Sequence, residues 1–159
     1  MSDTNPAPKK AKIDLKRADH NTIVNMNNNM NAANEKADAM FSAQRQAWTD
    51  ALMPIYQQIA TRDPNIITDA QSECLAIRSR LQSDISMNTA QLTKAYVSYK
   101  NAFGDRMEYY MTGFGVKTAS SEKVKMVDRD LAEAKRRAEL LETHIEFLKE
   151  CRYNCDQVG

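Results

Sequence analysis

The feature that most constrains this chain is an apolar pattern of seven-residue period between residues 122 and 155. Small and aliphatic side chains recur there at alternating spacings of three and four, which keeps one narrow stripe of a helix facing a partner helix. The stripe consists of Val124, Val127, Leu131, Ala134, Ala138, Leu141, Ile145 and Leu148. The pattern predicts a seam between subunits of a homo-oligomer. A helix packed inside one monomeric bundle is the alternative, because short heptad runs occur in bundles too.

The composition favours long helices and gives no sign of a membrane or of a strongly charged partner. Only four glycines and four prolines interrupt the 159 residues, and the net charge is +1. A charge so close to zero produces no overall field toward nucleic acid or membrane. No apolar run approaches the roughly 18 residues of a membrane-spanning helix. Three cysteines without a disulfide-type framework favour the cytoplasm or another reducing compartment.

Apolar periodicity predicts an all-α fold with three long helices near residues 22–60, 64–111 and 121–156. Asp63 can cap a helix that begins at Pro64. The Asn-rich stretch from Asn21 to Asn34 should fray unless a partner covers it, because asparagine competes for backbone hydrogen bonds. The short connection after residue 111 predicts that the last two helices form an antiparallel hairpin with coiled-coil character. Residues 21–159 are therefore expected to form one elongated helical domain.

Residues 1–20 are predicted to form a flexible basic arm. Positive charge gathers there at Lys9, Lys10 and Lys12. Such a cluster could contact phosphates or act as a nuclear-import signal. A solubilising tail is the simpler interpretation.

Aromatic and basic residues alternate near the end of the second predicted helix. Tyr96, Phe103 and Tyr110 recur every seven residues among lysines and arginines. Aromatic rings stack on bases and cations hold phosphates, which is the combination that single-stranded nucleic acid requires. The candidate binding residues are Lys94, Tyr99, Lys100, Arg106, Tyr109, Tyr110 and Lys117. The same spacing also suits a core face with lysines on its solvated flank.

One motif in this region resembles a known family. The run Arg106-Met107-Glu108-Tyr109-Tyr110, followed by Gly113, resembles the motif before a glycine turn in phage recombination mediators of the UvsY type. The segments 128–130 and 145–148 resemble that family's second long helix, so the resemblance covers about residues 70–155. It implies a non-enzymatic helical oligomer that binds single-stranded DNA and helps to load a recombinase. The first 65 residues of this chain have no counterpart in that family. The family's basic C-terminal helix has no counterpart in this sequence.

Residues suited to catalysis or metal binding are sparse. The chain has two histidines, His20 and His144, and no Gly-rich phosphate loop or nucleophile motif. His144, Cys151 and Cys155 could share a helix face, but a zinc site usually needs four closely spaced ligands. We therefore expect no enzymatic activity, no cofactor, no metal and no small-molecule substrate. The alternative to a recombination mediator is a helical structural or adaptor protein, such as a virion component, that acts through coiled-coil contacts without binding nucleic acid.

Overall fold

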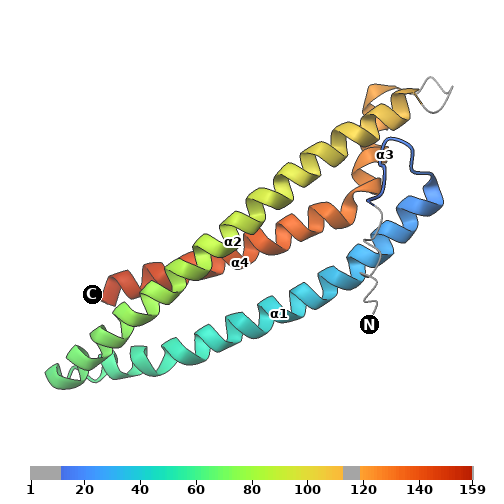
Figure 1. Ribbon diagram of the computed structural model, residues 1–159. Coiled ribbons are helices and arrows are strands. Elements are labelled where there is room, and N and C mark those ends of the chain that lie inside the picture. The colour runs from blue at the N-terminus through green and yellow to red at the C-terminus, as the bar shows by residue number, and fades with distance from the viewer. Residues whose placement is uncertain (1–11, 113–118, 159) are drawn as a thin grey trace, which may run out of the picture.

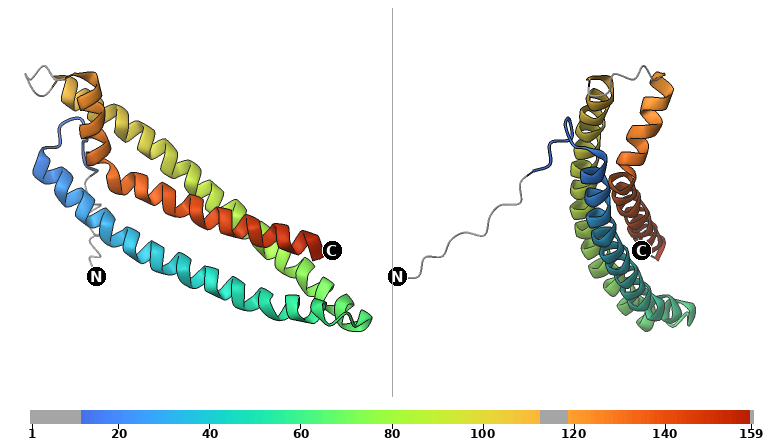
Figure 2. Two further views of the ribbon diagram at one scale, coloured as in Figure 1. Left: turned by 180° about the vertical axis from the view of Figure 1, so that it is seen from behind. Right: turned by 90° about the vertical axis from the view of Figure 1, so that its right-hand side faces the viewer.

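The computed structural model describes residues 12–112 and 119–158, which form four α-helices and no strand (Figure 1). Helix α1 spans His20–Ala60, α2 spans Pro64–Thr112, α3 spans Ser120–Asp130 and α4 spans Ala132–Val158. The all-α prediction is confirmed. Helices α1 and α2 run in opposite directions over most of the elongated body, and α4 returns along α2 (Figures 1 and 2). None of the described helices is both long enough and apolar enough to cross a bilayer.

Two aspartates determine where the long helices begin. The Asp19 carboxylate accepts a hydrogen bond from the Thr22 backbone N–H at 2.9 Å, which satisfies a donor in the first turn of α1. The Asp63 carboxylate accepts one from the Asn65 N–H at 3.0 Å. Pro64 is the first residue of α2, where it has no N–H to leave unpaired. The prediction that Asp63 caps a helix beginning at Pro64 is therefore confirmed.

The predicted third helix is two helices in the structure. Leu131, with φ −110° and ψ 17°, interrupts it between α3 and α4. The two helices point in different directions, so α3 stands across the end of the body while α4 lies along it (Figure 1). The prediction of a single helix over 121–156 is therefore wrong at Leu131. The helix axis turns there although the heptad pattern continues.

The Asn-rich part of α1 is helical because the chain's own break covers it. The side-chain amide of Asn27 donates to the Asp130 carbonyl at 2.9 Å, just before the break. Just after it, the amide of Asn34 donates at 2.9 Å to both the carbonyl and the carboxylate of Glu133. The covering partner that this stretch requires is therefore the α3–α4 junction, whose polar groups compensate the low helix propensity of asparagine.

The hydrophobic core lies where α2 and α4 pack together and α1 covers them. Trp48 and Leu52 from α1 meet Leu81 from α2 and Leu148 from α4 at one end of the body. A smaller cluster around Phe41 and Leu141 continues the core toward the break. Trp48 belongs to this core, and the Arg80 guanidinium lies 5.1 Å from its ring centroid.

The predicted oligomer seam faces the inside of the chain. Of its eight residues, six are buried, Ala134 is half-buried, and only Val124, at 38 %, is largely exposed. Helices α1 and α2 pack against α4 and occupy the positions that a partner helix would take. The stripe thus corresponds to the alternative, a helix packed inside one bundle, and in this fold it offers no free surface for a second copy.

His144 is a titratable group enclosed by this core. It is 1 % exposed, its ring centroid lies 4.4 Å from that of Phe41, and its Nδ1 has no hydrogen-bond partner. Burial lowers the pKa of His144 below 6.5, Arg45 lowers it further, and Asp84 opposes both. The folded chain therefore favours the neutral imidazole.

Acidification should destabilise the fold through His144. Because its pKa is lower in the folded state, the unfolded chain binds more protons below pH 6.5, and stability falls as the pH drops. Between pH 7.5 and 5.5 the free energy of unfolding should fall by up to about 1.4 kcal/mol. Urea unfolding at both pH values measures this difference. The variant His144→Phe keeps an aromatic ring beside Phe41 and should lose this dependence; equal pH dependence in both proteins would contradict the assignment.

Candidate functional site

Arg106 is buried at the junction of three segments. Its Nε and Nη2 donate to the same carboxylate oxygen of Asp130, at 3.0 and 2.9 Å. Its Nη1 donates to the backbone carbonyls of Leu15 at 3.0 Å and Ala18 at 2.8 Å. Arg106 is 1 % exposed. It therefore ties α2 to the end of α3 and to the segment that precedes α1.

Two tyrosines complete this cluster, which we call the Arg106 clasp: Arg106, Tyr109, Tyr110 and Asp130. The Tyr110 hydroxyl donates to the Asp130 carboxylate at 2.5 Å. The Tyr109 ring lies under the Arg106 guanidinium at 4.0 Å, which is within the range of a cation–π contact. Burial, followed by the hydrogen bond to Asp130, raises the pKa of Tyr110 above 10. The phenol thus stays protonated and remains a donor at neutral pH.

The clasp changes the role of the residues predicted to bind nucleic acid. Arg106 is buried in an ion pair with Asp130, which lies 24 residues further along the chain. Arg106 is therefore not available to a phosphate, which corrects its prediction as a nucleic-acid contact. Tyr109 and Tyr110 pack within the same cluster. Tyr99 is half-buried, and burial together with Asp128 raises its pKa. The structure therefore does not assemble these side chains into one open platform.

The remaining predicted contacts are scattered. Lys94 and Lys100 are exposed on α2. Tyr96, which belongs to the aromatic stripe, is 46 % exposed. Lys117, Lys9 and Lys10 lie outside the described residues. Lys12 lies in the segment before α1, whose residues Leu15 and Ala18 are held by Arg106, so the predicted arm is anchored at its end nearest α1.

The outward face of α2 carries a second heptad run, which sequence reasoning missed. Its members alternate at spacings of four and three, are small and uncharged, and are all exposed. They are Ser72, Ala76, Ser79, Ser83, Ser86, Ala90, Thr93 and Val97. We call this set the α2 outer stripe. The periodicity could have revealed it, but a search for large apolar residues passes over serine and alanine.

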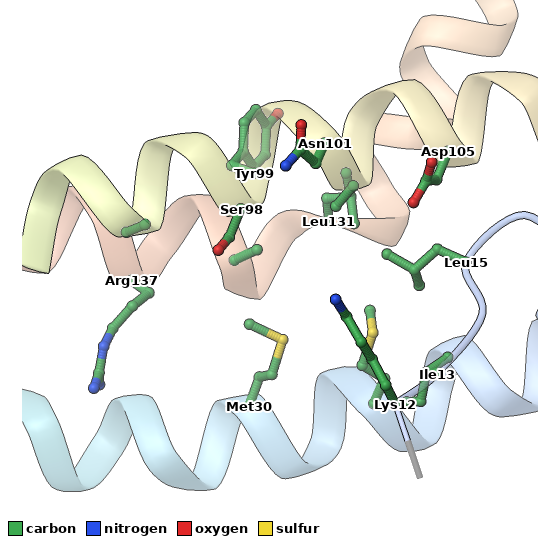
Figure 3. A pocket seen from close by; sticks show the side chains of 14 residues that line it. Lys12, Ile13, Leu15, Met30, Ser98, Tyr99, Asn101, Asp105, Leu131 and Arg137 are labelled. Carbon is green, nitrogen blue, oxygen red and sulfur yellow. The ribbon is translucent and has the colours of Figure 1, made fainter.

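A cavity of about 400 Å³ lies between α1, α2, the α3–α4 break and the segment before α1 (Figure 3). Its walls are mostly apolar and include Met26, Met30, Leu131 and Ala134. Arg137 reaches from α4 toward α1 at one side of this space (Figure 3). The Nη1 atom of Arg137 is buried and has no hydrogen-bond partner.

The three cysteines belong to the core. Cys74, Cys151 and Cys155 are free thiols, and all three are buried. Burial, followed by the nearby Cys74, raises the pKa of Cys155 to about 12. A thiol with so high a pKa is a poor nucleophile and a poor metal ligand at neutral pH. Within residues 12–112 and 119–158, no group of three His, Cys, Asp or Glu side chains could hold a metal ion.

The comparisons with known proteins assign no family. The sequence matches no protein-family model, and neither the curated proteins nor the solved structures include a significant match. The resemblance to recombination mediators therefore rests on the short motif and on the segments 128–130 and 145–148. That motif contains Arg106, Tyr109 and Tyr110, which are the residues of the clasp on α2.

Breaking the clasp should be costly because it leaves a buried charge unpaired. The variant Arg106→Met should lower the free energy of unfolding by about 3–5 kcal/mol, and the double variant Arg106→Met/Asp130→Leu should recover a large part of it. Urea unfolding followed by circular dichroism measures both. Lys16→Met is the matched control, because Lys16 and Glu108 form an ion pair at 3.5 Å with both side chains about half exposed. An Arg106→Met loss no greater than that of the control would contradict the role of the clasp.

Proposed function

We propose that this protein is a non-enzymatic helical assembly protein whose copies associate through the α2 outer stripe. The observation that carries the proposal is the lack of charge along this stripe, in a chain of which 27 % is charged. A solvated helix face usually carries charged residues. Small side chains at successive heptad positions allow two helices to approach closely over a long contact.

The rest of the fold leaves α2 free for this role. Its opposite face is covered by α1 and α4, so a further helix can reach only the outer side. Leu75 and Val97 lie on that side and are 64 % and 55 % exposed. At about 1.5 Å per residue, the stripe from Ser72 to Val97 is close to 40 Å long. A contact of that length suits a helical partner, and a second copy of α2 supplies a complementary one.

The proposed association agrees with the homo-oligomer expected from the sequence, but it assigns the contact between copies to α2 instead of α4. The coiled-coil contact belongs to α2, whereas the stripe on α4 is used inside the chain. It corresponds to the structural or adaptor alternative, in which helix–helix contacts and not a reaction are the function. With a net charge of +1, identical copies repel each other little.

A charge placed in the outer stripe should disrupt association. The variant Ala90→Glu puts a carboxylate where the interface would exclude water, so the dissociation constant should rise at least about tenfold. Gln91→Glu adds the same charge one residue away, outside the stripe, and should leave association unchanged. Sedimentation equilibrium measures both. A wild-type mass that stays at 18.0 kDa at all concentrations, or equal effects of the two variants, would contradict the proposal.

A second candidate function is binding of single-stranded DNA beside a recombinase, as the family resemblance implies. The observation that favours it is the exposed Tyr96 ring, one helical turn before the exposed Lys100. A single ring and a few lysines make a smaller site than the full set expected from the sequence. Such binding would weaken steeply with salt because the lysines displace counterions from phosphates.

Fluorescence anisotropy with a labelled oligothymidylate tests this second function. The variant Tyr96→Ala should weaken binding by about 5-fold or more, since stacking contributes about 1–3 kcal/mol per base. Tyr153→Ala removes an exposed tyrosine from α4 and serves as the control. A dissociation constant above about 1 mM at low salt, or equal loss in both variants, would exclude DNA binding at this position.

A further inference from the structure

The cavity beside the helix break is shaped for a small molecule. Four segments of the chain surround its volume of about 400 Å³, which is within the usual range of roughly 300–1,000 Å³ for ligand pockets. A flexible chain of several carbons fits in a space of this size.

Arg137, one of whose guanidinium nitrogens has no hydrogen-bond partner, lies at one side of the cavity. The Nη1 of Arg137 is buried and makes no hydrogen bond. The neighbouring Arg136 shows the usual arrangement, because it pairs with Glu35 at 2.7 Å and with Glu133 at 3.5 Å. Arg137 is half-buried, and a carboxylate bound in the cavity would give its guanidinium an ionic partner.

The other charged groups around the cavity are compatible with an anion. Lys12 extends into the same space from the segment before α1 (Figure 3). Asp105 is the only carboxylate that lines the cavity among the described residues, and it lies on the side away from Arg137 (Figure 3). A ligand carboxylate at Arg137 would therefore meet little repulsion from Asp105. The space between is lined by Met26, Met30, Leu131 and Ala134.

We propose that this cavity binds an amphipathic anion, namely a medium-chain alkyl carboxylate. The carboxylate accepts hydrogen bonds from Arg137, and the alkyl chain packs among the methionines of α1 and the apolar residues at the start of α4. Both α1 and α4 then contact one ligand, beside the break that separates α3 from α4. The site is independent of the α2 outer stripe, which lies on the other side of α2.

Isothermal titration of the full chain with octanoate tests the proposal. Octanoate should bind with a dissociation constant below about 1 mM, and octylammonium, with the same chain and opposite charge, should bind at least tenfold more weakly. The variant Arg137→Met should weaken octanoate binding at least tenfold. Arg129→Met, which removes an exposed arginine from α3, should leave it unchanged. No saturable binding of octanoate, a preference for octylammonium, or equal affinity in Arg137→Met would overturn the proposal.

A second measurement separates loss of the site from loss of the fold. Because Arg137→Met replaces a cation with an unsatisfied nitrogen by a flexible apolar side chain, its melting temperature should equal or exceed that of the wild type. If this variant does not fold, Ala102→Leu fills the cavity from α2 and leaves Arg137 in place. Octanoate binding by Ala102→Leu as tight as that of the wild type would also overturn the proposal.

Discussion

The buried ion pair between Arg106 and Asp130 is the interaction on which the arrangement of the helices depends. It joins the C-terminal part of α2 to the last residue of α3, and the same guanidinium holds the segment that leads into α1. A charge pair with so little exposure is favourable only when every donor and acceptor is satisfied. Here Tyr110 and two backbone carbonyls complete the set. The clasp therefore specifies where α3 ends.

The helix break at Leu131 has consequences for the rest of the surface. It turns α3 across the end of the body, and the amides of Asn27 and Asn34 bond the polar groups on its two sides. The cavity that Arg137 lines lies beside this break. The buried ion pair and the asparagine contacts thus lie at one end of the structure, and the apolar core around Trp48 and Leu148 lies at the other.

Local chemistry made part of this fold predictable. Asp63 and Pro64 identify the start of α2 because capping requires only neighbouring residues. The stripe on α4 was recognised correctly as a packing face, but a heptad pattern does not specify whether its partner belongs to the same chain. The break at Leu131 was missed because the apolar spacing continues through it. It lies next to Asp130, which Arg106 holds, and the contacts of Arg106 at residues 15, 18 and 130 are distant in sequence. The cavity was unpredictable for the same reason, since four segments form it.

The functional proposals follow from which helix faces are buried within the fold and which are exposed. The face of α4 is buried, Arg106 is paired, and the outer stripe of α2 remains exposed and uncharged. The most direct test is cross-linking between copies with a short bismaleimide. The variant Ser86→Cys places a reactive thiol in the outer stripe, and Ser42→Cys places one on the exposed side of α1. The native cysteines are buried and should not react. We predict a covalent dimer for Ser86→Cys alone; equal cross-linking of Ser42→Cys, or none in either variant, would contradict association through α2.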